Sequence, residues 1–588
     1  MLNTLKSLKT AVPAITLIFG ACTVAGNSAQ PDDNDYDILI KNGTVVDGSG
    51  GPEFGADVGI VDDEIVAVSR NLQDASADRV IDAEGKLVTP GFIDLHNHAD
   101  RYMIQGDMEY RMAENHLLQG IATIVGAPDG RTREFPLDEE IAVFEDPGIG
   151  MNFVPMVGHQ EVRSQVMGDD FRRHATDDEV EEMKALVREG MEMGAWGIGT
   201  GLEYQPGVYS HPDEVVEIAH VVAEYGGFHF SHMRGSGRVP KDRYPSKLTE
   251  YPDQVSYTNH SGPHMVEAWN TDAQDAIMEI INIAREAGIP SVASHVKAKG
   301  RMSWGRALND IILVQEARDE GHPVYMDQYP YEGHSGSNAT LVPGWATDGE
   351  SDDHRENLQA TLDDPEQKED LLIDTDYVID YKGGPDRLLV TYYEDEALIG
   401  KKLDEVAEDL GKSPAEAVWH FMLEGMDDVY EGIYIRPLSL HPKDVELYMK
   451  QDFTATSSDA RLISGRGLHP RHYGAFARKI AHYVRDEEVI SLPHGIRSST
   501  GLPAQIIGLP DRGYIKEGYK ADVLVFDLDE FEDRSTPIEP EKKAVGMQYM
   551  LVNGIFSIDG GEFQEELAGE VINRNEVQAS PERDRANR

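Results

Sequence analysis

The chain has 588 residues, of which 40% are hydrophobic and 27% charged, and its formal net charge is −53 at pH 7. This length suits one large domain with a smaller one, or two to three domains. Because so acidic a surface repels phosphates, we exclude nucleic acid as a partner; the dispersed acidic residues indicate a heavily solvated surface, with a site for cationic ligands as the alternative.

Residues 1–22 have the pattern of an export signal. Lys6 and Lys9 precede the apolar segment 11–20, and small residues stand directly before Cys22. This pattern resembles a bacterial lipoprotein signal, so we expect a periplasmic protein whose membrane contact is a lipid anchor at Cys22; an ordinary secretory signal is the alternative. Cys22 is the only cysteine, which excludes an intramolecular disulfide. Residues 23–35 are small and polar, as in a flexible tether.

Both ends of the remaining chain are rich in short β-runs. Residues 36–90 contain four such runs separated by Asn-Gly and Asp-Gly turn signals, and residues 501–565 contain further runs with another Asn-Gly turn. We therefore predict a small composite β-sandwich domain built from both termini. Residues 566–588 are predicted to be a polar, frayed tail.

Residues 91–500 alternate between apolar strand-like runs and helical runs. This alternation predicts a parallel sheet, and about eight repeats favour an α/β fold of the (β/α)₈ TIM-like barrel type. Residues 236–270 and 344–380 interrupt this alternation of strands and helices, so we interpret them as loop insertions over the barrel mouth. In such barrels the active site lies at the carboxyl ends of the strands.

A His-x-His pair follows the first strand of this region. Residues 88–95 are apolar, and His96 and His98 come directly after them. Side chains two residues apart on a strand point to the same face, so both imidazoles can reach one metal ion. The alternative is a pair of surface histidines on a turn.

Later predicted strands end in more residues of the same kind. His232 ends Phe228-His-Phe-Ser-His, His295 ends Val292-Ala-Ser-His, and Asp459 ends Thr454-Ala-Thr-Ser-Ser-Asp. Each alone has an ordinary explanation, such as a helix N-cap for Asp459. Together with the His-x-His pair they converge only in a closed barrel. The ordered set therefore predicts a site for one or two divalent metal ions, with zinc favoured.

The residue types suit hydrolysis. A metal lowers the pKa of bound water, gives hydroxide near neutral pH and polarises a carbonyl oxygen. Asp459 beside the metal can take the proton of the water and pass it to the leaving group. The sequence thus predicts a metal-dependent hydrolase with Asp459 as the catalytic residue.

The chain resembles the amidohydrolase superfamily, and within it the D-aminoacylase (N-acyl-D-amino-acid deacylase) family. The resemblance covers about residues 36–560, outside the insertions. It rests on seven motifs: Val157-Gly-His-Gln-Glu-Val-Arg163, Gly194-Ala-Trp-Gly-Ile-Gly-Thr-Gly-Leu-Glu-Tyr-Gln-Pro-Gly207, His232-Met-Arg234, Ser294-His-Val-Lys-Ala-Lys-Gly300, Asp327-Gln-Tyr-Pro-Tyr331, Ser457-Ser-Asp459 and His469-Pro-Arg-His-Tyr-Gly-Ala-Phe-Ala-Arg478.

The resemblance implies a zinc enzyme that cleaves the amide bond of N-acyl-D-amino acids. It also implies that Lys297, Tyr331 and Ser337 hold the substrate carboxylate, which a lysine and two hydroxyls suit chemically. Tyr329 and Ser335 are the alternatives if the register shifts by two residues.

One departure concerns a metal ligand. The family usually has a cysteine in a Gly-Asn-Cys-Gly turn after the second strand, whereas this chain has Gly126-Ala-Pro-Asp-Gly130. We expect Asp129 to replace the cysteine as a ligand, although an Asp-Gly turn is also ordinary. Glu203 is the alternative bridging residue. Arg234 and His472 lie beside the motifs and are candidates for shaping the pocket.

Two further functions stay open. A cyclic amidase (hydantoinase-like) or a dipeptidase of the same superfamily is compatible with the altered cysteine position and the insertions. A non-catalytic periplasmic binding protein on the same barrel is the more remote alternative. Such a protein is expected to have lost at least one ligand, whereas the four histidines and Asp459 are all present.

Overall fold

The computed structural model of the chain describes residues 35–72, 74–236, 273–334, 338–347, 351, 353–424 and 434–579. The expected signal, the tether up to residue 34 and almost all of the insertion at 236–270 lie outside these ranges. Within them, no helix is both long and apolar enough to cross a membrane.

The centre of the molecule is a closed parallel barrel, as predicted. Its strands in chain order are β6 (Phe92–Asp94), β7 (Ile121–Val125), β8 (Asn152–Val154) continued by β9 (Val157–Gly158), β10 (Gly197–Gly201), β11 (Phe228–His232), β12 (Ser291–Ser294), β13 (Val324–Gln328) and β16 (Thr454–Thr456). A parallel bridge between Asn97 and Ala460 joins the last strand to the first. The strands are buried along their length, which explains their continuous apolar sequences.

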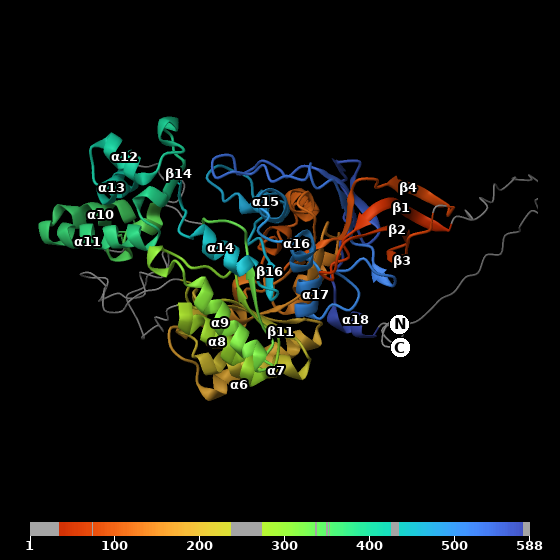
Figure 1. Ribbon diagram of the computed structural model, residues 1–588. Coiled ribbons are helices and arrows are strands. Elements are labelled where there is room, and N and C mark those ends of the chain that lie inside the picture. Colours follow the sequence, from red (N-terminus) through yellow and green to blue (C-terminus); the bar gives the residue numbers. More distant parts are fainter. Residues whose placement is uncertain are drawn as a thin grey trace, which may run out of the picture.

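Helices cover the outside of the barrel (Figure 1). They include α4 (Leu137–Glu145), α5 (His159–Met167), α6 (Asp177–Glu192), α7 (Pro212–Glu224), α8 (Ala273–Ala287), α9 (Ala307–Asp319), α14 (Pro442–Met449), α15 (Arg471–Arg478), α16 (Leu492–Ser499) and α17 (Gly501–Ile507). A capping box at Thr176 and Glu179 starts α6. The apolar faces of these helices and the strands form one large core.

Both chain ends build one β-domain beside the barrel, as predicted (Figure 1). Its ten hydrogen-bonded strands are β1 (Tyr36–Val45), β2 (Phe54–Val61), β3 (Glu64–Ser69), β4 (Ala77–Asp82), β5 (Leu87–Pro90), β17 (Tyr519–Lys520), β18 (Val523–Phe526), β19 (Met547–Val552), β20 (Ile555–Asp559) and β21 (Glu562–Phe563). The two halves meet where β5 pairs antiparallel with β18 and where β3 pairs antiparallel with β17. A second core, with residues from both halves, lies against this sheet.

A helical subdomain projects between β13 and β16, at the end of the molecule opposite the β-domain (Figure 1). It contains α10 (His354–Asp363), α11 (Pro365–Tyr381), β14 (Leu388–Tyr392), α12 (Leu403–Leu410), α13 (Pro414–Glu424) and β15 (Tyr434–Pro437) around its own apolar core. The interpretation of 344–380 as a loop is therefore wrong. Asp364 caps α11 and Pro365 occupies its first turn, so this polar stretch is helical.

The expected frayed tail also differs from the structure up to residue 579. Val571 and Ile572 are buried, and the Trp196 indole donates a hydrogen bond to the Ile572 carbonyl at 2.7 Å. The short helix α18 (Arg574–Ala579) follows. A few apolar residues thus dock the polar tail onto the barrel.

Candidate metal centre

Six of the predicted side chains meet at the carboxyl ends of the barrel strands. In chain order they are His96 and His98 after β6, Asp129 after β7, His232 at the end of β11, His295 after β12 and Asp459 after β16. Their ligand atoms form three overlapping groups, each with all atoms within 4.8 Å of one another: His96, His98 and Asp129; His96, His295 and Asp459; Asp129, His232 and His295.

Asp129 lies between the histidines. Its Oδ1 is 2.9 Å from His232 Nδ1 and 3.6 Å from His96 Nε2, and its Oδ2 is 3.5 Å from His98 Nε2. The carboxylate thus occupies the position at which the sequence lacks the expected cysteine. Across the group, Asp459 Oδ1 is 3.2 Å from His98 Nε2 and 3.9 Å from His96 Nε2.

The donor set fits a divalent metal ion. Imidazole nitrogens with carboxylate oxygens are ligands that zinc accepts. His96 Nε2 is fully buried, faces both carboxylates and has no hydrogen-bond partner among the described residues. A buried polar atom without a partner is costly, and a metal ion would satisfy it.

The backbone at three of these positions is strained. Asp129, His295 and Asp459 have φ values of 55°, 37° and 51°, in the left-handed region that residues other than glycine rarely adopt. Such conformations cost about 1–3 kcal/mol each and persist only where the surrounding structure enforces them. Their concentration at one site indicates selection for side-chain placement.

Hydrogen bonds at the strand ends enforce these conformations. Asp94 accepts bonds from the His96 amide and from the amide and hydroxyl of Ser458, which ties β6 to the end of β16. Asp327 accepts the His295 amide at 2.8 Å. Burial raises the pKa of Asp94 to about 7 and that of Asp327 to about 6.

The motif at 157–163 supports the Asp129 turn. The Gln160 amide donates to the carbonyl oxygens of Asp129 and Gly201. A Cβ at Gly201 would lie 2.1 Å from the Asp129 carbonyl oxygen, so only glycine permits this close approach. Arg163 and His159 both contact the buried Glu214 and fix the start of α5.

Glu203 contacts one of the metal-centre histidines, His232, a contact that the sequence alone did not specify. Its Oε2 is 2.8 Å from His232 Nε2, the ring nitrogen opposite the one that faces Asp129. Glu203 therefore orients His232 and does not bridge the ligand group. A carboxylate behind a ligating histidine is a common arrangement in metal sites.

Arg471 is a site residue that the sequence analysis missed. It is the first residue of α15, and its Nη1 is 2.6 Å from Asp459 Oδ2. Its guanidinium carbon also lies 5.1 Å from the centre of the Tyr329 ring. It stands inside the His469–Arg478 motif, and that motif was the only signal that could have identified it.

The predicted carboxylate-binding residues are only partly brought together. Lys297 is buried, with its Nζ 2.8 Å from His295 Nδ1 and 5.6 Å from the Tyr329 ring centre. The Tyr331 hydroxyl donates to Asp533 at 3.4 Å, whereas the ring of its alternative Tyr329 lies 6.4 Å from the His295 ring. Ser337 and its alternative Ser335 lie outside the described residues.

The two other residues that the sequence placed near the pocket have structural roles. Arg234 pairs with Glu279 and donates to the Val208 carbonyl. His472 Nδ1 accepts a hydrogen bond from the Arg461 amide. Neither side chain belongs to the ligand group.

Burial and charge together set the protonation states. Burial, aided by neighbouring histidines, outweighs the nearby carboxylates and lowers the pKa of His96 to about 3. Burial alone would raise the pKa of Asp459, yet Arg471 and His98 hold it well below its usual range. Burial lowers the pKa of Lys297 to about 8 although Asp459 opposes this. Neutral His96 and ionised Asp459 are the protonation forms that bind metal, whereas Asp129 and Glu203 outweigh burial and raise the pKa of His232.

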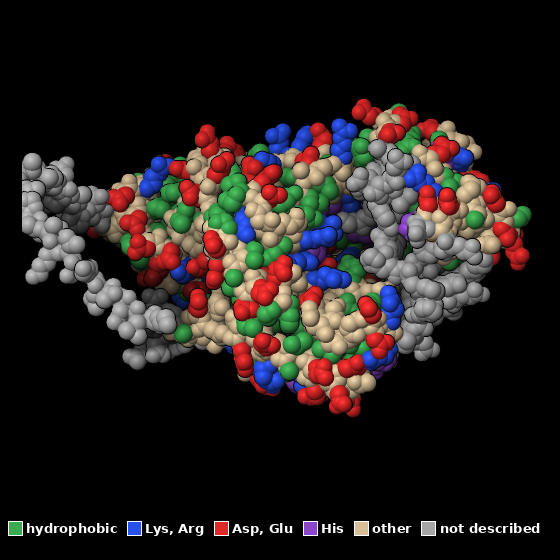
Figure 2. All heavy atoms as spheres, turned by 180° about the vertical axis from the view of Figure 1, so that it is seen from behind, with side chains coloured by type: hydrophobic (Ala, Val, Ile, Leu, Met, Phe, Trp, Pro, Cys, Tyr) green, Lys and Arg blue, Asp and Glu red, His purple; other side chains and the backbone are tan. Residues whose placement is uncertain are grey.

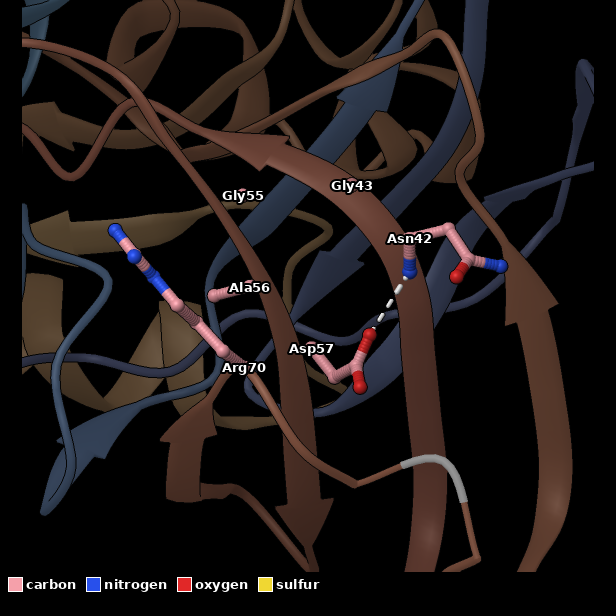
Figure 3. Close-up of a pocket in the computed structure, with 6 residues that line it drawn as sticks. All are labelled: Asn42, Gly43, Gly55, Ala56, Asp57 and Arg70. Carbon is pink, nitrogen blue, oxygen red and sulfur yellow. Dashed lines mark hydrogen bonds between the residues drawn. The ribbon is translucent and has the colours of Figure 1, made fainter.

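A separate small pocket lies in the β-domain and holds none of these residues. Figure 3 shows its lining, in which the backbone amide of Asn42 donates to Asp57 at 2.9 Å and Arg70 stands at the rim.

Comparison with known proteins agrees with this architecture. The amidohydrolase family model matches residues 79–251 and 393–555. The D-aminoacylase of Alcaligenes xylosoxydans xylosoxydans is 29% identical, over 93% of this chain and 99% of the relative.

Two solved structures are similar over nearly the whole chain. A D-aminoacylase structure described for its binuclear metal centre has a TM-score of 0.67 and 28% identity, covering 92% of this chain and 100% of that chain. The N-acyl-D-glutamate deacylase of Bordetella bronchiseptica, solved with zinc and a phosphonate inhibitor, has a TM-score of 0.69 and 25% identity, covering 92% and 99%. This chain belongs to the amidohydrolase family.

Proposed function

We propose that this protein is a metal-dependent hydrolase that cleaves the amide bond of N-acyl-D-amino acids. One observation carries the proposal: six metal-ligand candidates from five strand ends meet beside a buried lysine and a buried arginine. Full-length similarity to D-aminoacylases supports the same reaction class.

The three ligand groups would hold one or two zinc ions. Each pair of groups shares at least one residue, namely His96, Asp129 or His295. A divalent metal bound there would lower the pKa of a water molecule and polarise the amide carbonyl.

The side chains of the protein supply the proton transfer and the substrate contacts. Asp459 accepts a proton from the attacking water and delivers it to the amide nitrogen as the carbon–nitrogen bond breaks. The water oxygen stays on the released acid, and the amine leaves with its proton. Lys297, Arg471 and the Tyr329 hydroxyl surround the position for the substrate carboxylate.

The test is amine release from a paired panel of N-acyl-D- and N-acyl-L-amino acids, with the protein lacking residues 1–22. Turnover confined to the D-series, lost on chelation and restored by zinc, is the expected result. If the metal-loaded protein hydrolyses neither the D- nor the L-series, the proposed substrate class is wrong. Cyclic amides and dipeptides then become the substrates to assay.

We further propose that the protein is exported and anchored through lipidated Cys22. The support is the order of basic residues, apolar segment and small residues before the cysteine. The expected result is that full-length protein partitions with bacterial membranes and that Cys22→Ser moves it to the soluble periplasmic fraction. Equal partitioning of both forms would contradict the anchor.

A further inference from the structure

Buried cations gather at the barrel mouth where it meets the helical subdomain. Lys299 is 2% exposed and Lys382 is 9% exposed, and they come from the loop after β12 and from the end of α11. Neither belongs to the metal-ligand groups. Lysine side chains are almost never buried to this extent unless they are paired.

The two lysines lie close together. Lys299 Nζ is 5.7 Å from the ring centre of Tyr381, the residue directly before Lys382. A Cβ at Gly300 would be 2.0 Å from the Tyr381 carbonyl oxygen, so the two segments are in direct contact. Lys382 Nζ donates to Thr340 Oγ1 at 3.3 Å. The two lysines thus lie in one packed contact region between the barrel and the helical subdomain, here called the wall.

His334 adds a buried donor or acceptor to the same wall. Its Nδ1 pairs with Ser439 Oγ at 2.8 Å, while Nε2 on the opposite edge has no hydrogen-bond partner among the described residues. The His334 side chain is 5% exposed, and the charges of Lys299 and Lys382 act on it. A buried ring nitrogen without a partner calls for a ligand or water.

The electrostatics at this wall favour an anion. Burial, aided by the charge of Lys299, lowers the pKa of Lys382 to about 7, opposed by Glu203. The charge of Glu203 also acts on Lys299, whose pKa burial lowers, and Glu203 Oε2 lies 2.8 Å from His232 Nε2. A second negative charge brought by a ligand would offset the repulsion between the lysines.

The surface of the molecule also has a recess lined by basic side chains (Figure 2). Figure 2 shows a hollow in which Lys and Arg side chains gather and histidine is visible, although acidic side chains are scattered over the rest of that face. In a chain of net charge −53, such a concentration of cations is a local feature. It would attract anionic substrates toward the metal centre.

We propose that Lys299, Lys382 and His334 bind a second carboxylate of the substrate, so that the preferred substrates are dicarboxylic N-acyl-D-amino acids. This inference rests on the proposed function. The second carboxylate can stand on the amino-acid side chain or at the free end of a dicarboxylic acyl group. Both sources present the same chemistry to the lysines.

The test compares each acid with an uncharged analogue of similar size. N-acetyl-D-glutamate is paired with N-acetyl-D-glutamine, and N-succinyl-D-leucine with N-butanoyl-D-leucine. We expect the wild type to prefer one of the acids by about tenfold or more in kcat/KM, because hydrogen bonds to charged groups contribute about 1.5–3 kcal/mol. The acid that is preferred identifies the source of the carboxylate.

Variants then locate the site. Lys299→Met and Lys382→Met are expected to remove the preference while leaving the kcat/KM of the neutral substrates within about threefold. Lys368→Met is the matched control, because Lys368 is an exposed residue of the same helix α11 as Tyr381. Wild-type kcat/KM values that are equal for acid and neutral analogue, or a loss of both in Lys382→Met, would overturn the inference.

A binding measurement separates this inference from the proposed function. Calorimetric titration with glutarate is expected to show binding to the wild type and Lys368→Met and at least tenfold weaker binding to Lys382→Met. If the protein hydrolyses neutral N-acyl-D-amino acids but does not prefer the dicarboxylic ones, only the second-carboxylate inference is contradicted, and the proposed function stands. Absence of all hydrolysis would contradict the proposed function. Equal glutarate affinity in all variants would then also contradict the proposed carboxylate site.

Discussion

Lys479 allows the cost of a buried charge to be measured in this fold. It starts the π-helical segment Lys479–Asp486 after α15, is 3% exposed, and donates to Thr456 Oγ1 at 2.6 Å. Burial lowers its pKa from 10.5 to about 7. His494 on α16 is the titratable neighbour whose own pKa is lowered first by burial and then by the Lys479 charge.

The sign and size of the effect follow from this pKa. Between pH 7 and 10.5 the unfolded chain binds more protons than the folded protein, so stability rises with pH across this window. Below pH 7 the full penalty is present, and the pKa difference corresponds to about 5 kcal/mol. Lys479→Met removes the penalty but also the bond to Thr456, worth about 1 kcal/mol. The expected net stabilisation is about 3–4 kcal/mol at pH 6.

The assay is thermal unfolding of wild type and variant at pH 6 and pH 10. With an unfolding entropy of about 2.1 cal/mol/K per residue, or about 1.2 kcal/mol/K for the 588 residues, the variant is expected to unfold about 2–3 °C higher at pH 6. The difference is expected to shrink toward zero at pH 10, where the lysine is largely neutral in the folded protein. An equal shift at both pH values, or a lower unfolding temperature at pH 6, would refute the reasoning.

The remaining predictions concern the metal centre. Asp459→Asn keeps a residue that tolerates positive φ, so we expect a folded protein with at least 10³-fold lower kcat; near-normal turnover would show that Asp459 does not carry the proton. Asp129→Ala removes a member of two ligand groups, so we expect lower metal content by elemental analysis of the purified protein; unchanged stoichiometry would contradict its role. Tyr329→Phe is expected to raise KM about tenfold because it loses a hydrogen bond to the charged carboxylate, whereas Tyr331→Phe leaves KM unchanged; the reverse order would restore the register predicted from sequence.

The strand-end ligands could be predicted because parallel strands of a barrel end at one rim. His96, His98, His232, His295 and Asp459 each follow an apolar run, and the period of a strand fixes which side chains share a face. No other information was needed to expect them at one site. For Asp129 the strand pattern does not decide the role, because an Asp-Gly turn has the same sequence whether or not its carboxylate faces a metal centre.

The residues that the sequence left open or missed lie outside the barrel strands. Tyr329 and Tyr331 follow β13, where the chain leaves the sheet and the strand period no longer applies. Arg471 reaches Asp459 from a helix that begins twelve positions later, and such a contact depends on tertiary packing. The helix α11 could have been predicted, since Asp364 followed by Pro365 is a helix-start signal.

The composite β-domain has a consequence for the synthesis of the protein. β5 has its antiparallel partner in β18, so the first strands to leave the ribosome have no neighbour on that side until the chain is nearly complete. Roughly 430 residues separate the two strands, which corresponds to about 20–90 s of translation at 5–20 residues per second. During that interval the edge of β5 has unpaired backbone groups, which can pair with other chains until β18 is synthesised. The last barrel strand, β16, is synthesised before β18. All strands of the barrel are therefore available before the β-domain can form its complete sheet.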